Sequence, residues 1–163
     1  MELNEYEVLS TEYCVFWLRL VKNKIMQYWL LKSEPYKYSW DNLVQDQSTF
    51  WDGVRNFQAR NNLKAMKKGD YALFYHSNEG KAIVGIAQIS KEVYQDPTTE
   101  DTNWVVVEIV PICKLKQNIS LETIKAHPVL RNMSLVKQSR LSVCPVSPEE
   151  FDLICQLGGV ELS

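Results

Sequence analysis

Four polar residues in the first half of the sequence are of the types that perform nucleophilic or acid and base chemistry: Ser33, Glu34, Asp52 and His76. A serine becomes a nucleophile when a neighbouring histidine removes its proton. However, the sequence contains no G-x-S-x-G elbow, P-loop, HExxH motif or Cys–His constellation. A lone histidine is more often a hydrogen-bonded structural residue. An enzyme is therefore the weaker hypothesis.

A second concentration of chemistry lies in the segment Phe50-Trp51-Asp52-Gly53-Val54-Arg55-Asn56. It places an aromatic ring, an acid, a base and an amide just before a predicted helix, and Gly53 allows close backbone approach. Most large aromatic residues belong to a core, but Trp51 in this setting offers a face for stacking. The segment therefore predicts a site that reads an extruded nucleic-acid base.

The cysteines and histidines do not predict a metal site. Cys14, Cys113, Cys144 and Cys155 form no CxxC pair, and the two histidines lie far apart in the chain. Local ligand pairs are typical of zinc sites, so we expect no metal and no other cofactor. The apolar run that ends at Leu18 is shorter than the ~20 residues that a membrane-spanning helix needs, so no membrane partner is predicted.

Charge is nearly balanced overall, with 18 basic and 20 acidic residues, but it is segregated along the chain. Residues 55–68 and 114–140 together hold eleven basic residues and only one acid, Glu122. If these two segments lie side by side, they form a positive face of the kind that binds phosphate. The alternative is that each is a solvated surface.

The elements that must position these residues alternate between strand and helix. A length of 163 residues, with 45% hydrophobic and 23% charged residues, is typical of one globular domain. Periodicity and capping residues predict strands at 28–31, 71–76, 82–89, 104–110 and 140–143, and helices at 39–44, 57–68, 120–127 and 148–157. The connections are too short for repeated βαβ crossovers. We therefore predict an α+β fold: a curled, mixed and mostly antiparallel β-barrel with short peripheral helices.

Residues 1–25 differ from the rest of the chain, with four acids, no Gly or Pro, and Met26 just before the first predicted strand. Two interpretations remain open. The segment is either an extra helix packed on the domain or a poorly ordered extension produced by an upstream start codon. The predicted domain itself covers residues 26–160.

Four motifs resemble those of one known family. They are Trp29-Leu30-Leu31-Lys32-Ser33-Glu34-Pro35, Trp51 to Asn61, Phe74-Tyr75-His76-Ser77-Asn78, and Ser139-Arg140-Leu141-Ser142-Val143 followed by Pro148-Glu149-Glu150-Phe151. In this order and spacing they are similar to the EVE domain family, over about Met26 to Leu157. The resemblance implies a PUA-like fold related to YTH domains, and a pocket for a modified base such as modified cytosine in DNA or a modified RNA base.

The resemblance also assigns site residues. The implied base pocket comprises Lys32, Ser33, Trp51, Asp52, Gly53, Val54, Asn56, Tyr75, His76 and Ser77. Separately, because stacking alone roughly offsets the cost of extruding a base, phosphate contacts are expected from Arg55, Arg60, Lys64 and Arg140, with Arg140 in the last strand. A non-catalytic reader of a modified base is thus the leading hypothesis. The alternative is a binder of, or an enzyme acting on, a small nucleoside-like metabolite.

The segment 96–103 is short where longer eukaryotic members of the family carry an insertion, which favours a bacterial-type chain with a single domain. We accordingly expect a monomer located in the cytoplasm, or in the nucleus if the source is eukaryotic.

Overall fold

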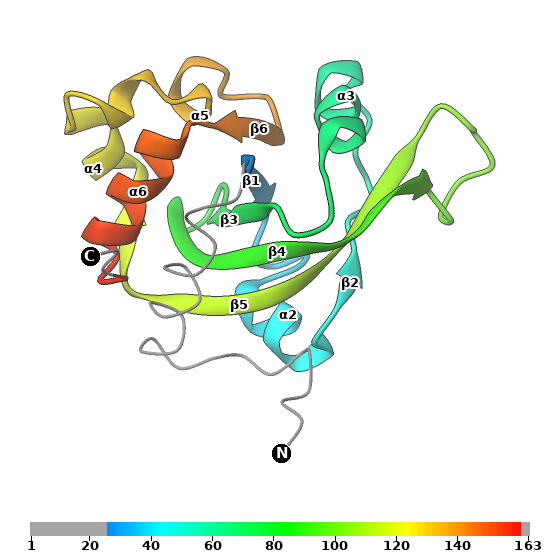
Figure 1. Cartoon of the computed structure of the whole chain (residues 1–163), viewed down its shortest axis with the longest axis horizontal. Coiled ribbons are helices and arrows are strands. Elements are labelled where there is room, and N and C mark those ends of the chain that lie inside the picture. The colour runs from blue at the N-terminus through cyan, green and yellow to red at the C-terminus, as the bar shows by residue number, and fades with distance from the viewer. Residues whose placement is uncertain (1–25, 161–163) are drawn as a thin grey trace.

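The computed structural model describes residues 26–160 (Figure 1). The interpretations of residues 1–25 therefore lie outside the described part of the chain. Its strands are β1 (Tyr28–Ser33), β2 (Thr49–Phe50), β3 (Tyr71–His76), β4 (Ala82–Gln95), β5 (Val105–Ser120) and β6 (Val143–Val146). Its helices are α2 (Trp40–Asp46), α3 (Phe57–Ala65), α4 (Leu121–Ala126), the 3₁₀-helix η1 (Leu130–Asn132), α5 (Ser134–Lys137) and α6 (Pro148–Leu157).

The six strands form one mixed sheet in the order β2-β5-β4-β3-β1-β6. Strands β1 and β3 are parallel, with Ser33 opposite His76, and the other pairs are antiparallel. The predicted α+β class and the mixed, mostly antiparallel sheet are therefore confirmed. Because parallel strands run in the same direction, β1 and β3 end at the same edge of the sheet, which brings the residues after each strand together.

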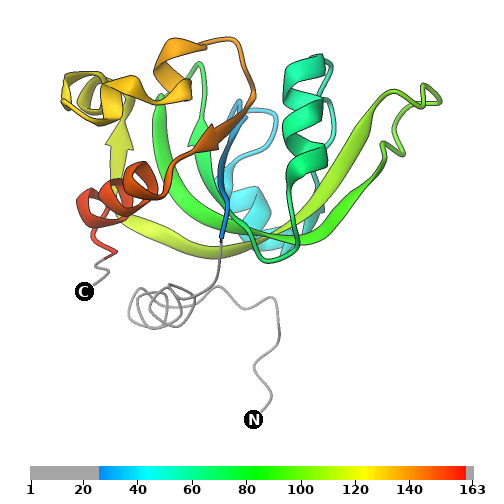
Figure 2. The same cartoon turned by 45° about the horizontal axis from the view of Figure 1, so that its top comes forward.

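Strands β4 and β5 form a long hairpin whose pairing shifts register at several points, including Ile83/Gly85 and Ile89/Lys91. Such bulges bend and twist a strand pair, and the hairpin curls accordingly in both views (Figures 1 and 2). The edge strands β2 and β6 are not paired with each other in the sheet that residues 26–160 form. The sheet is open, so the closed barrel is not confirmed. Helix α3 stands between β6 and the outer arm of the hairpin, where the Asn62 amide donates to the Val143 carbonyl (2.8 Å).

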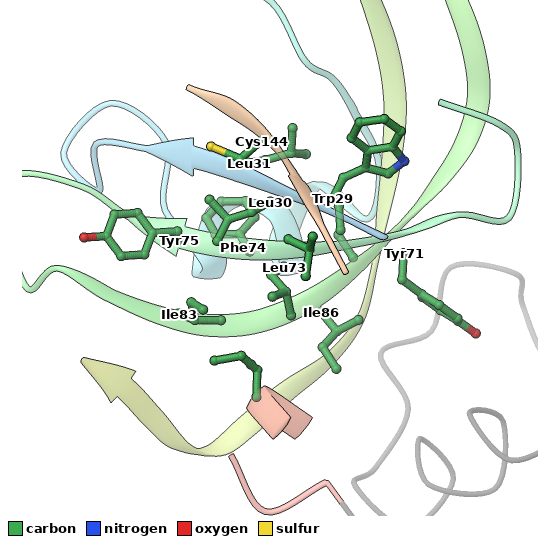
Figure 3. Packing of buried hydrophobic residues seen from close by; sticks show 14 of the residues in the cluster. Trp29, Leu30, Leu31, Tyr71, Leu73, Phe74, Tyr75, Ile83, Ile86 and Cys144 are labelled. Carbon is green, nitrogen blue, oxygen red and sulfur yellow. The ribbon is translucent and has the colours of Figure 1, made fainter. Parts of the chain in front are cut away.

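The core is built on the central strands. Leu30 of β1 pairs with Leu73 of β3, and Leu31 pairs with Phe74. These four side chains are fully buried and pack beside Ile83 and Ile86 of β4 (Figure 3). Near-continuous apolar runs of this kind are expected in strands that are covered on both faces.

Two helices begin as their capping residues predict. The Ser39 hydroxyl accepts from the Asn42 amide and starts α2, and Ser147 and Glu150 form a reciprocal capping box at α6. Trp40 of α2 is buried against β4 at Gly85, where an added Cβ would lie 2.6 Å from the indole. This contact fixes α2 on the sheet.

Several predicted boundaries are wrong. Helix α3 ends at Ala65 because Met66 takes an extended conformation, three residues before the predicted end. The hairpin strands continue far beyond the predicted 82–89 and 104–110. The last strand is Val143–Val146, so Arg140 lies in the loop before it. This strand contains Pro145, which is tolerated because β6 is at the edge of the sheet.

Candidate functional site

A cavity of about 630 Å³ opens beside the ends of the parallel strands β1 and β3; we call it the first cavity. Four separate segments line it: the end of β1 with the following turn, residues 49–54, residues 77–78 after β3, and the loop before β6. Eight of the residues predicted for the site line it, namely Lys32, Ser33, Trp51, Asp52, Gly53, Val54, Ser77 and Arg140.

Trp51 forms a rigid wall of the first cavity. Its backbone amide donates to the Val107 carbonyl (2.8 Å), which extends the pairing of β2 with β5. Its ring makes edge contacts with Phe74 (5.6 Å between centroids) and Tyr38 (6.3 Å). The residue is 8% exposed, so it presents part of its indole to the cavity while most of it belongs to the core.

Ser33 and Ser77 meet because β1 and β3 are parallel. The Ser33 carbonyl accepts from the Ser77 amide (2.8 Å), where Ser33 ends β1 and Ser77 directly follows β3. The Ser33 hydroxyl donates to the Tyr38 carbonyl (2.6 Å) and so holds the turn that follows β1. This hydroxyl is therefore engaged with the backbone rather than with a histidine.

Lys32 fixes another wall. Its ammonium donates to the carbonyl of Ser139 (3.0 Å) and, more weakly, to that of Gln138 (3.5 Å). Burial lowers the pKa of Lys32, because desolvation disfavours the charged form. The side chain thus holds the loop that carries Arg140, while Arg140 itself is exposed and lines the cavity.

Three residues of the predicted base pocket do not line the first cavity. Asn56 is the N-cap of α3, and its side-chain oxygen accepts from the Ala59 amide (2.9 Å). Tyr75 is buried, with 3% exposure. His76 accepts from the Trp40 amide at the start of α2 (3.1 Å), and burial lowers its pKa, which favours the neutral ring that this bond requires.

Three of the four predicted phosphate ligands lie outside the first cavity. Arg55 pairs with the fully buried Asp96 (2.9 Å) and lies over the Trp104 ring. Arg60 lies over the Phe57 ring (4.8 Å), and Lys64 is exposed on α3. Of the four, only Arg140 lies at the cavity.

The structure adds lining residues that the sequence did not assign to the base pocket: Glu34, Lys37, Tyr38 and Asn78. Pro35 starts a turn in which the Tyr38 amide donates to the Glu34 carbonyl (3.0 Å), so Tyr38 folds back onto Trp51. Glu34 pairs with Lys37 (2.8 Å), and hydrogen bonds from Lys37 and Tyr36 lower its pKa. The alternation of aromatic and basic residues at 36–38, directly after a predicted site strand, was the available sequence signal.

Neither a metal site nor a membrane span is found in the described part of the chain. No group of three or more His, Cys, Asp and Glu residues within 26–160 is placed to hold a metal ion. Among the same residues, no helix has the length and apolar character needed to cross a membrane.

The described residues thus form a small domain with an open, curled mixed sheet and a polar and aromatic cavity at the ends of its parallel strands. The family model described as "EVE domain" matches residues 27–157. The chain therefore belongs to the EVE domain family, as its motifs predicted.

Relatives in bacteria and vertebrates share most of the chain. A crystal structure of an Agrobacterium tumefaciens protein is 47% identical (TM-score 0.80) and covers 82% of this chain and 94% of its own. Thymocyte nuclear protein 1 of Gallus gallus is 40% identical, over 80% of this chain and 68% of that protein. Human THYN1 protein, solved in complex with 5-methylcytosine containing DNA, is 36% identical (TM-score 0.76) over 83% of this chain and 99% of its own. The location of this chain, in the cytoplasm or in the nucleus, stays a prediction.

The predicted relation to YTH domains is confirmed at the level of fold. The YTH domain of Zygosaccharomyces rouxii MRB1 protein is 17% identical, with a TM-score of 0.53, over 83% of this chain and 88% of its own.

Proposed function

We propose that the protein is a non-catalytic nucleic-acid-binding module that takes a modified base of DNA into the first cavity. The observation that carries the proposal is the cavity itself, of about 630 Å³, with an indole wall and convergent polar groups. Its volume lies within the ~300–1,000 Å³ that is usual for small-molecule sites. The human relative at 36% identity, solved with DNA that contains 5-methylcytosine, supports this choice of ligand.

The polar groups suit a base that carries an exocyclic amine, as cytosine does. Asp52 and Glu34 line the cavity, and a carboxylate accepts from the exocyclic amine of cytosine. The hydroxyl and amide of Ser77 and Asn78 add donors and acceptors. Asn56 has a different role in this proposal, because its side-chain oxygen caps α3.

The energetics require more than stacking. Extruding a base from a duplex costs a few kcal/mol, and a full aromatic stack returns about 1–3 kcal/mol. Trp51 is only 8% exposed, so its contribution lies at the lower end of that range. Hydrogen bonds to the base edge and contacts with the DNA backbone supply the rest.

Three of the four residues that suggested catalysis, Ser33, Glu34 and His76, are engaged elsewhere. Ser33 donates to the Tyr38 carbonyl, and His76 accepts from the Trp40 amide. Glu34 pairs with Lys37. These partners leave no serine, histidine and carboxylate set joined by hydrogen bonds within residues 26–160, which favours binding over turnover.

Asp52→Asn tests the proposal. Asp52 is exposed, so the change should leave folding intact, whereas the lost carboxylate should weaken binding to a duplex with one 5-methylcytosine about tenfold. Glu122→Gln on α4 is the matched control, because Glu122 is exposed and does not line the cavity. Fluorescence anisotropy with modified and unmodified duplexes of the same sequence measures both effects.

Three outcomes would contradict the proposal. Equal affinity for modified and unmodified duplexes would remove base reading. Binding of the free modified nucleoside as tightly as the duplex would favour the metabolite alternative. A chemical change in the nucleoside during incubation with the purified protein would establish an enzyme. An equivalent RNA oligonucleotide with a modified base, run in parallel, decides between DNA and RNA.

A further inference from the structure

A second cavity, of about 310 Å³, lies next to the first cavity. Asn56 and Gln58 at the start of α3 line one side, and the loop 137–141 lines the other. Ser139 and Arg140 line both cavities. A ligand that occupies the first cavity could therefore extend past this loop into the second cavity.

The second cavity has the chemistry of an anion site. Its two charged side chains, Lys137 and Arg140, are both basic, and no carboxylate lines it, in contrast to the first cavity with Glu34 and Asp52. Neither base forms an ion pair within residues 26–160. The amides of Gln58 and Gln138 add neutral donors. Two unpaired cations with amide donors suit phosphate oxygens.

The loop is held in place rather than loose. The Lys32 ammonium donates to the carbonyls of Ser139 (3.0 Å) and Gln138 (3.5 Å). The Leu141 amide donates to the Gln138 carbonyl (3.0 Å), which closes a tight turn. Lys137 and Arg140 are thus carried on a fixed backbone that separates the two cavities, and a fixed cation loses less entropy when it binds.

We propose that the second cavity binds the backbone phosphate that flanks the base held in the first cavity. This inference rests on the proposed function, and it assigns Lys137 to the site although the sequence did not. Arg140 faces both cavities and so contacts the same nucleotide as the base pocket. Lys137 lines only the second cavity, so a substitution of Lys137 tests that cavity without changing the lining of the first.

Lys137→Gln tests the assignment through the salt dependence of binding. The Lys137 side chain is exposed and makes no hydrogen bond or ion pair among residues 26–160, so the variant should fold normally. Losing one phosphate contact should make the slope of log affinity against log salt shallower by about 1. Between 50 and 200 mM salt, the factor by which affinity falls should therefore be about fourfold smaller for the variant than for the wild type. Lys125→Gln on α4 is the control, with an unchanged slope.

A neutral linkage in the DNA identifies the phosphate. A methylphosphonate placed directly 5′ or 3′ of the modified base should weaken wild-type binding severalfold at one of the two positions. The same neutral linkage should reduce the binding affinity of the Lys137→Gln variant much less. An unchanged slope in Lys137→Gln, or an equal methylphosphonate penalty in both proteins, would overturn the inference. If the wild type instead shows no preference for the modified duplex, the proposed function fails. The salt slopes of the wild type and of Lys137→Gln, measured on unmodified DNA, still test whether the second cavity binds phosphate.

Discussion

His76 illustrates, at the scale of single residues, how a side chain of catalytic type can serve the fold. Its ring accepts from the Trp40 amide at the start of α2 and meets the Phe74 ring edge-on, 5.7 Å between centroids. Burial is the main cause of its lowered pKa, followed by Asp41, which raises the pKa, and Lys114, which lowers it. The residue therefore links β3 to α2 as a neutral acceptor.

We expect this role to appear as a pH dependence of stability. Because the pKa of His76 in the folded protein lies below its ordinary 6.5, the unfolded chain binds a proton more readily. The stabilisation is fully present above pH 6.5 and is lost as the pH falls from there toward the pKa of the folded state. His76→Phe removes the acceptor and should cost about 1 kcal/mol at pH 7.5. The difference between the two proteins should narrow at pH 5.5.

Urea unfolding at both pH values measures this narrowing. A stability difference that stays constant or widens at pH 5.5 would contradict the assignment of His76 as a neutral acceptor.

The packing of α2 on the sheet is decided by one glycine. An added Cβ at Gly85 would lie 2.6 Å from the Trp40 ring, and that ring is 2% exposed and packs edge-on against Phe74. Gly85→Ala should therefore destabilise the protein by about 2 kcal/mol, because overpacking forces side chains and backbone to shift. The free energy of unfolding from a urea titration gives the value.

A double-mutant cycle separates this clash from a loss of backbone freedom. Trp40→Phe creates space at the same contact, so it should recover part of the stability lost in Gly85→Ala. If the two losses simply add, the clash with Trp40 is not the cause.

The elements differ in how far local sequence determined them. Helices α2 and α6 begin at their predicted caps because Ser39 and Ser147 bond to the first turn, which is a local interaction. The lengths of β4 and β5 were underestimated because their outer halves are stabilised by pairing with each other across the hairpin, which no local pattern reports. The last strand was predicted at 140–143 but lies at Val143–Val146, because the position of β6 depends on its pairing with β1.

At the scale of the whole molecule, the site also combines features that local sequence predicts with features that only the tertiary structure sets. The segment 50–56 and the strand ends at Ser33 and Ser77 were accessible to prediction, since they lie in short motifs. Their convergence depends on the parallel pairing of β1 with β3. The roles of Arg55 and Asn56 could not be read from the sequence, because the buried partner Asp96 and the cap of α3 are set by the tertiary structure.

The distribution of cations predicts a shallow salt dependence for the whole molecule. The basic residues in and just before α3 do not line the first cavity: Arg55, which precedes the helix, is paired with Asp96, and Lys64 is exposed on the helix. Around the two cavities, Lys32 is bonded to backbone carbonyls and Lys37 to Glu34, which leaves Lys137 and Arg140 as the cations that pair with nothing within residues 26–160.

At about 0.9 per neutralised phosphate, two contacts give a slope of log affinity against log salt of about −2 for the modified duplex. Anisotropy titrations from 50 to 300 mM salt measure this slope. A slope steeper than about −4 would mean that the basic residues of α3 and of the segment after it also engage the DNA, as a broad positive face.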